Sequence, residues 1–326
     1  MACMPQFSLL HPSTAADAVA LLAANADARF LAGGTDLLPN IRRGLLAPPV
    51  LIDLGGVSEL REMRVEAGML RIGAGVSLAT IAGDVRVRKQ LPALAQAALA
   101  VAGPTHRAAA TLGGNLCLDT RCVYYNQSEF WRESNDYCMK LKGEGCRVAK
   151  KSKRCYAAFS GDVAPALIAL DAEIEILGPN GSRRIAIADF YRDDGMAWLT
   201  LAPDELLTGV HIPLCDGWTT AYEKVRVRGA IDFPLAGIAV ALKRKGDTLE
   251  ELRIACTGVS SRPLAVEGLD ELKGKPLDAA ALAIIVAQTE IAAGAMRTTL
   301  VEVLYRRGVA PVLARRITER LWNAAA

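Results

Sequence analysis

Short apolar runs that stop at paired glycines mark the beginning of the chain. Residues 28–31 and 50–54 are such runs, which is typical of buried strands that end in turns. Residues 17–28 carry alanine and leucine at helical spacing, with Thr14 as the expected helix cap. The pattern predicts a small α/β lobe over about the first 55 residues.

A second unit combines longer strands with alanine-rich helices. Alternating polarity over residues 172–177, followed by Pro179-Asn180-Gly181, predicts a strand that turns back on itself. The helical pattern of residues 91–102 stops at Gly103-Pro104. Further strands are expected at residues 69–72 and 205–212, and a further helix from residue 78.

The composition changes near Asp216-Gly217, where a third unit begins. Its strands are expected at residues 221–227, 238–243 and 252–257, and its helices at residues 278–293, 298–307 and 309–322. The sequence thus predicts an α+β protein of three parts, residues 1–57, 58–216 and 217–326.

Composition and charge narrow the function classes. The chain has 326 residues, of which 52% are hydrophobic and 22% charged, as in soluble globular proteins. A net charge of +3 gives no case for nucleic-acid or membrane binding. Residues 1–11 show no export signal, and the apolar stretch 279–296 is too short and too polar to span a bilayer. We therefore expect a cytoplasmic protein.

Two similar glycine loops suggest a bound phosphate. Ala32-Gly33-Gly34-Thr35-Asp36 and Thr111-Leu112-Gly113-Gly114-Asn115 both follow apolar segments. Glycine lets the backbone wrap an anion with its N–H groups, although one such pair is more often a plain turn. Ile72-Gly73-Ala74-Gly75 lacks the third glycine and the acidic residue of a Rossmann motif.

Together, the two loops resemble the FAD-binding medium subunits of molybdenum hydroxylases, the family of xanthine oxidase and carbon monoxide dehydrogenase. Further landmarks match in order over nearly the whole chain: Val101-Ala102-Gly103, Ser160-Gly161-Asp162, Leu207-Thr208-Gly209-Val210 and Tyr222-Glu223-Lys224. The resemblance implies a two-lobed FAD-binding domain of the PCMH/vanillyl-alcohol-oxidase type. It also implies a C-terminal α+β domain of the CO dehydrogenase flavoprotein type.

The resemblance also implies a set of FAD-binding residues. Asp162 would accept hydrogen bonds from FAD, and Lys224 would lie near the flavin and stabilise its reduced, anionic form. Taken alone, Asp162 could instead cap a helix, and Lys224 could be a solvated strand residue. The full set is Phe30, Leu31, Ala32, Gly33, Gly34, Thr35, Asp36, Leu37, Val101, Thr111, Leu112, Gly113, Gly114, Asn115, Asp162, Leu207 and Lys224.

Four cysteines distinguish this chain within the family pattern. Most members run almost directly from the second glycine loop to the Ser-Gly-Asp segment, whereas here an insertion at about residues 118–158 intervenes. It holds Cys122, Cys138, Cys146 and Cys155, without the Cys-x-x-Cys pairs of ferredoxins or zinc sites. Four thiolates can bind either an iron–sulfur cluster or zinc.

Nearby charge favours a 4Fe–4S cluster. Residues 147–154 contain five cations, which would stabilise the extra electron of a reduced cluster. The insertion resembles that of the β subunit of 4-hydroxybenzoyl-CoA reductase, which implies an additional 4Fe–4S cluster. Structural zinc and unliganded thiols are the alternatives. The basic run could also be a solvated loop or a docking patch for an acidic ferredoxin.

The remaining cysteines and the aromatic side chains are expected to be structural. Cys3, Cys215 and Cys256 are isolated, and Cys117 should point into the core beside the second glycine loop. The insertion's aromatic residues should shield the cluster from water: Tyr124, Tyr125, Phe130, Trp131 and Tyr137.

The three histidines form no catalytic pattern. They are scattered along the chain, and His211, which alternates with apolar neighbours, is expected on a strand surface. We therefore expect no catalytic residue here, with substrate chemistry on another subunit.

The resemblance predicts an FAD and 4Fe–4S subunit of a 4-hydroxybenzoyl-CoA reductase-like oxidoreductase. Ferredoxin would donate electrons, which would pass to a small 2Fe–2S subunit and a large molybdenum subunit, in a dimer of heterotrimers. Three alternatives stay open: an oxidative hydroxylase of the same family, a flavin-binding assembly protein with structural zinc, and a free-standing flavin oxidase.

Overall fold

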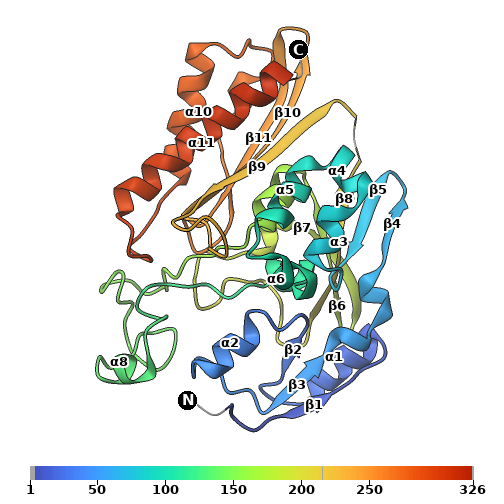
Figure 1. Cartoon of the computed structure of the whole chain (residues 1–326), viewed down its shortest axis with the longest axis vertical. Helices are drawn as coiled ribbons and strands as arrows, with labels where there is room; N and C mark the ends of the chain where they lie inside the picture. The colour runs from blue at the N-terminus through green and yellow to red at the C-terminus, as the bar shows by residue number, and fades with distance from the viewer. Residues whose placement is uncertain (1–3, 215, 325–326) are drawn as a thin grey trace.

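The computed structural model describes residues 4–214 and 216–324, which include neither Cys3 nor Cys215. Three sheets stack along the long axis of the molecule, with the N-terminal sheet at the bottom of Figure 1 and the C-terminal sheet at the top. Within the described residues, no helix is long and apolar enough to cross a membrane.

The first sheet is small and parallel. Its order is β1 (Ser8–Leu10), β3 (Val50–Asp53), β2 (Arg29–Leu31), and it is covered by α1 (Ala15–Ala24). Thr14 caps α1 as expected, since its side chain accepts a hydrogen bond from the Asp17 N–H. A short helix, α2 (Leu37–Arg42), follows β2 directly, so the first glycine loop lies between them.

The second sheet is antiparallel and supports the second glycine loop. Its five strands are, in spatial order, β4 (Met63–Glu66), β5 (Met69–Gly73), β8 (Leu206–Pro213), β6 (Glu173–Gly178) and β7 (Gly181–Ala186). Five helices form the main core with one face of it: α3 (Leu78–Gly83), α4 (Val85–Gln90), α5 (Pro92–Ala100), α7 (Leu112–Leu116) and α9 (Val163–Ala169). Another helix, α6 (Pro104–Ala109), lies beside α3 and buries none of its own residues.

The third sheet is antiparallel and lies between two layers of helices. Its order is β12 (Leu264–Ala265), β11 (Thr248–Thr257), β10 (Ala236–Lys245), β9 (Trp218–Val225). One face packs on α10 (Ala279–Ala292) and α11 (Val303–Ala324). The other packs on α5 and α9 through small side chains, Ala93, Ala97, Ala166, Ala239 and Ala255 among them. Alanine lets these helices approach the sheet closely.

The C-terminal helices differ from the sequence expectation. Residues 298–307 and 309–322 were expected to be two helices, but one helix, α11, begins only at Val303 and continues through Pro311. Thr298 is held outside the helix because its carbonyl accepts a hydrogen bond from the Val123 N–H, and its hydroxyl accepts one from Arg306.

Candidate functional site

The first glycine loop is shaped by a close backbone contact. A Cβ on Gly33 would lie 1.9 Å from the Ala109 carbonyl oxygen, so only glycine fits there. Gly34 has a φ of +68°, in the left-handed region. Within the described residues, the peptide N–H groups of Gly33, Gly34 and Thr35 donate to no protein atom. Free N–H groups on a tight turn are what an anion requires.

The second glycine loop forms the start of α7. The Thr111 hydroxyl accepts a hydrogen bond from the Gly114 N–H at 3.1 Å. A Cβ on Gly113 would lie 2.8 Å from the Ala74 Cβ, so a side chain at position 113 would clash with Ala74. This contact explains why the second loop needs a glycine there. The Asn115 side chain turns inward, where its Oδ1 accepts a hydrogen bond from the Val163 N–H at 3.1 Å. Because Gly33 contacts Ala109, two residues before Thr111, the two loops lie next to each other.

Asp162 and Lys224 form a buried ion pair between the second lobe and the C-terminal domain. The Lys224 Nζ lies 2.9 Å from the Asp162 Oδ1, and the Tyr222 hydroxyl donates to the same oxygen at 2.6 Å. Burial raises the pKa of Asp162, while the Lys224 ammonium opposes that rise. The alternative interpretations, a helix cap for Asp162 and a solvated strand residue for Lys224, are wrong. Asp162 makes no side-chain cap to α9, and the Lys224 side chain is only 3% exposed.

Val101 and Leu207 are the two predicted FAD-binding residues that would contact the cofactor through apolar groups. Val101 ends α5 and packs against the main core, while Leu207 is buried in β8 beside Gly113. Their roles toward FAD, like those of the other predicted binding residues, remain predictions.

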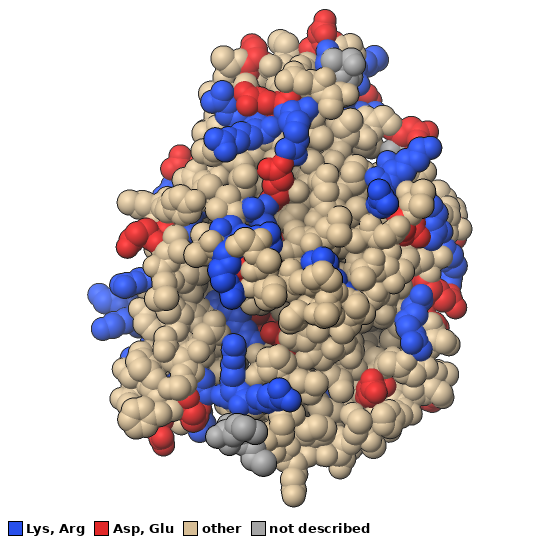
Figure 2. All heavy atoms as spheres, in the orientation of Figure 1, with Lys and Arg blue, Asp and Glu red and all other residues tan. Residues whose placement is uncertain are grey.

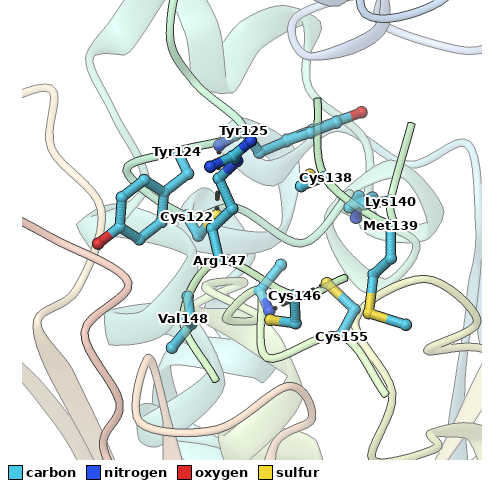
Figure 3. Close-up of a pocket in the computed structure, with 11 residues that line it drawn as sticks. Cys122, Tyr124, Tyr125, Cys138, Met139, Lys140, Cys146, Arg147, Val148 and Cys155 are labelled. Carbon is cyan, nitrogen blue, oxygen red and sulfur yellow. Dashed lines mark hydrogen bonds between the residues drawn. The ribbon is translucent and has the colours of Figure 1, made fainter. Parts of the chain in front are cut away.

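The four predicted cysteine ligands line one pocket (Figure 3). All four are buried, although they are spread over 34 positions of sequence. The structure therefore brings together the set Cys122, Cys138, Cys146 and Cys155.

Backbone N–H groups point at two of these sulfurs. The Cys122 Sγ accepts from the Tyr125 N–H at 3.3 Å, and the Cys155 Sγ from the Ala157 N–H at 3.4 Å. Burial still raises the pKa of Cys122 to about 11. A hydrogen bond from the Cys155 thiol lowers the pKa of Cys146 and raises its own. A bound cation would displace these protons.

The four sulfurs line one pocket, which bears on the kind of metal centre they could hold. Among the described residues, no three His, Cys, Asp or Glu side chains are grouped closely enough to hold a single ion. A cluster binds its four thiolates at different irons, whereas zinc needs four ligands that meet at one point. The cysteine set has the number and kind of ligands that a cluster requires.

The insertion is closed at its base and anchored to the first lobe. Arg121 and Ala158 pair through two backbone hydrogen bonds, of 2.8 and 2.7 Å, so the two ends of the insertion meet. The Arg121 guanidinium also forms an ion pair with Asp36, at 3.1 Å, in the first glycine loop. The buried Arg132 of α8 (Glu129–Glu133) donates to the Arg43 carbonyl. The cysteine pocket is thus tied to the predicted flavin loop.

The aromatic side chains only partly match their expected role. Tyr124 and Tyr125 line the cysteine pocket, and Trp131 stacks on Tyr124 with ring centroids 6.2 Å apart. Phe130, however, is 79% exposed and shields nothing, so that expectation is wrong for this residue. It lies at the start of α8, on the exposed side of the helix, whereas Arg132 of the same helix is buried.

Most of the basic run faces water. Lys150, Lys151 and Lys153 are exposed, whereas Arg147 lines the pocket and Arg154 pairs with Asp193. Figure 2 shows lysine and arginine side chains gathered at the left, where Figure 1 places the insertion. The exposed lysines therefore lie on the segment that joins two of the pocket cysteines, Cys146 and Cys155.

Three residues outside the cysteine pattern make buried contacts that the sequence did not predict. His211 is 1% exposed, not on a surface, and its Nε2 lies 2.7 Å from Glu175. Lys140 is buried beside the cysteine pocket, and Arg121 bridges insertion and flavin loop. No local pattern marks them, because each partner is distant in sequence.

The two remaining described cysteines are structural as expected. Cys117 packs against the main core, and burial raises the pKa of its thiol to about 12. Cys256 is fully buried in β11, and burial likewise raises the pKa of its thiol to about 12.

Comparison with known families identifies the scaffold. A model described as the FAD binding domain in molybdopterin dehydrogenase matches residues 5–215. A second, described as the CO dehydrogenase flavoprotein C-terminal domain, matches residues 220–321. The chain belongs to the FAD-binding medium subunits of the xanthine oxidase and CO dehydrogenase family. It is a flavoprotein subunit of an oxidoreductase complex, and the predicted α+β fold class is confirmed.

Individual members of the family support the same conclusion. The chain is 34% identical to the aldehyde oxidoreductase FAD-binding subunit PaoB of Escherichia coli, over 82% of this chain and 86% of that protein. It is 31% identical to the carbon monoxide dehydrogenase medium chain of Afipia carboxidovorans, over 96% of both chains. The solved CO dehydrogenase of Oligotropha carboxidovorans superposes with a TM-score of 0.82 at 29% identity, covering 99% of this chain and 100% of that one.

These flavoprotein relatives support FAD as a cofactor of the chain. The geometry of both glycine loops fits it, since the first offers free N–H donors and both are held by backbone contacts that exclude side chains. When bound, FAD would supply one- and two-electron transfer. The relatives named above are not described as carrying an iron–sulfur cluster in this subunit, so the cluster rests on the cysteine pocket alone.

Proposed function

We propose that the chain is an electron-transfer subunit that carries both FAD and a 4Fe–4S cluster. The observation that carries the proposal is the convergence of Cys122, Cys138, Cys146 and Cys155 on one buried pocket, tied to the first glycine loop. When bound, the cluster would supply one-electron transfer to and from the flavin site.

The chain's own residues would perform the positioning. The cysteines would hold the cluster, and the N–H groups of Tyr125 and Ala157 would stabilise the thiolates. The two glycine loops would hold the FAD phosphates, and the 17 predicted residues keep their proposed roles. Lys224, held by Asp162, would place a fixed cation near the flavin. We propose the same three-part division at residues 57 and 216.

The exposed lysines favour an acidic protein as the electron partner. Lys150, Lys151 and Lys153 lie on the loop between Cys146 and Cys155, and such single-sign surfaces steer association with an oppositely charged protein. We propose a ferredoxin in this role. We propose a large molybdenum subunit and a small 2Fe–2S subunit as further partners, in a dimer of heterotrimers in the cytoplasm.

Two reactions of the whole complex are candidates. The cysteine insertion supports a 4-hydroxybenzoyl-CoA reductase, in which ferredoxin electrons pass through this subunit to reduce the substrate. The relatives, which include aldehyde oxidoreductase and CO dehydrogenase subunits, support an oxidative hydroxylase with electrons moving outward. Anaerobic mixing of the complex with each substrate separates them. Flavin bleaching by an aldehyde or heterocycle supports the oxidative reaction, and reoxidation of the reduced complex by 4-hydroxybenzoyl-CoA supports the reductive one.

Metal and flavin counts on the anaerobically purified complex test the cluster. We expect Cys122→Ser or Cys146→Ser to remove about four irons and four sulfides per FAD while FAD stays bound. Cys256→Ser is the matched control, because this cysteine is buried but lies in β11 outside the pocket.

Three results would contradict the proposal. Zinc in place of iron and sulfide would support the assembly-protein alternative. Equal iron in wild type and both pocket variants would show that the cysteines bind no cluster. Substrate turnover by the purified chain alone would support a free-standing oxidase.

A further inference from the structure

Lys140 is a buried cation beside the cysteine pocket. Its side chain is 6% exposed, and it lines the pocket together with the four cysteines. Its Nζ lies over the rings of Tyr125 and Trp198, 5.0 and 4.8 Å from their centroids. Its position excludes water from the ammonium group, so its charge is poorly screened.

The protein fixes this ammonium group from several sides. The Nζ donates to the Asp119 carboxylate at 2.7 Å, to the Gly195 carbonyl at 2.7 Å and to the Thr120 carbonyl at 3.0 Å. The Thr120 hydroxyl is a fourth partner. A lysine that only packed against a core would not need so many acceptors, because its flexible stem usually carries the charge into water.

The charges behind Lys140 alternate in sign toward the flavin loop. Asp119 pairs with Lys140, Arg121 lies 3.9 Å from Asp119, and Asp36 lies 3.1 Å from Arg121. The two cations and two anions balance, with the positive end at the cysteine pocket and the negative end at the first glycine loop. Among these four charged groups, the one that lines the cysteine pocket is therefore the cation, Lys140.

We propose that Lys140 is the positioning residue that sets the reduction potential of the cluster, with Asp119 holding it in place. This inference rests on the proposed function. Reduction adds one electron to the cluster from a one-electron donor, without making or breaking a bond. A fixed cation at the pocket wall stabilises that added charge and raises the potential.

Exposed lysines of the same insertion cannot substitute for Lys140. Lys150, Lys151 and Lys153 face water, which screens their charge at the pocket. Arg147 lines the pocket, but its Nε donates to the Tyr137 carbonyl, and no carboxylate in residues 4–214 or 216–324 fixes its guanidinium. Lys140 is the lysine of this segment whose charge is both buried and fixed.

A reductive titration of the anaerobically purified complex, followed by electron paramagnetic resonance, tests the inference. The cluster signal is the one that Cys146→Ser abolishes. We expect Lys140→Met to make reduction at least about tenfold less favourable, about 59 mV for one electron. Lys140→Arg keeps the cation and should recover most of that shift. Asp119→Asn should shift the potential upward, and Lys151→Met, the exposed control, should leave it unchanged.

The outcomes separate this inference from the proposed function. A wild-type complex without iron and sulfide beyond those of its other subunits overturns both. A full cluster in Lys140→Met with the wild-type potential overturns the inference alone. If Lys140→Met loses the cluster, Lys140→Gln decides: a lowered potential supports the inference, and an unchanged or higher potential overturns it.

Discussion

Gly33 shows how a single position can constrain two loops at once. Its Cα approaches the Ala109 carbonyl so closely that a methyl group would overlap it, and Ala109 leads directly into the second glycine loop. The repeated Gly-Gly pattern in the sequence predicted both loops. It did not predict that one loop packs on the other, because that contact joins residues 76 positions apart.

We predict that Gly33→Ala lowers FAD affinity at least about fivefold, since overpacking of this kind costs about 1–3 kcal/mol. Binding is measured by titrating the deflavinated complex with FAD. Gly83→Ala is the control, because this glycine at the end of α3 has no neighbour within 4 Å of the added methyl group and has no positive φ. Equal affinity in both variants would contradict the role of the close contact.

Three neighbouring strands are joined by a charged network on the face opposite the main core. Glu175 of β6 accepts hydrogen bonds from Arg71 of β5, at 3.0 Å, and lies 2.7 Å from the His211 Nε2 of β8. Burial disfavours the Glu175 charge, but these partners outweigh it and lower the pKa of Glu175 to about 2. The carboxylate therefore stabilises the sheet as an anion.

This network predicts an acid-sensitive contribution to stability. The folded pKa of Glu175 lies below its usual value of about 4.5, so its contribution is complete above pH 4.5 and is lost as the pH falls toward 2. Glu175→Gln should cost on the order of 2–3 kcal/mol at pH 7. The difference from wild type should shrink below pH 4.5.

Urea unfolding of the FAD-loaded chain across this pH range measures the difference. Glu62→Gln, at an exposed ion pair with Arg64, should change stability by less than about 0.5 kcal/mol at any of these pH values. A pH-independent difference for Glu175→Gln would show that its charge is not what stabilises the sheet.

The same network shows the limit of pattern-based prediction for elements. Strands such as 172–177 could be predicted because alternating polarity depends only on neighbouring residues. The glycine loops could be predicted for the same reason, since a turn is set by adjacent residues. His211 has the same alternation, yet it is buried because Glu175, itself held by Arg71, pairs with the His211 Nε2 from another strand. The cysteine pocket was predicted as a set, whereas Lys140 and Arg121 depend on partners that no local pattern reveals.

The C-terminal domain also contributes to the cysteine pocket. Arg306 of α11 is 1% exposed and donates to the Met296 carbonyl at 2.9 Å and the Thr298 hydroxyl at 2.8 Å. The Thr298 carbonyl in turn accepts a hydrogen bond, at 2.7 Å, from the N–H of Val123, next to Cys122. A helix near the end of the chain thus supports a proposed cluster ligand in the insertion.

We predict that Arg306→Met lowers both the thermal midpoint and the iron content of the complex, because it leaves buried carbonyls unpaired at a cost of about 3 kcal/mol. The neighbouring Arg307→Met is the control, since Arg307 is 48% exposed and pairs with Glu290, at 3.6 Å, on the surface. Iron per FAD and thermal unfolding are measured on both. Unchanged iron in a destabilised Arg306→Met would show that the domain supports the fold without supporting the pocket.

The backbone pairing of Arg121 with Ala158 has a consequence for the history of the chain. A segment whose two ends already meet can be lengthened, shortened or lost during evolution while the surrounding fold stays the same. The whole cysteine set lies within that closed segment. An ancestor could therefore have acquired the four-cysteine segment in a single genetic event, without changes to the flavoprotein that received it.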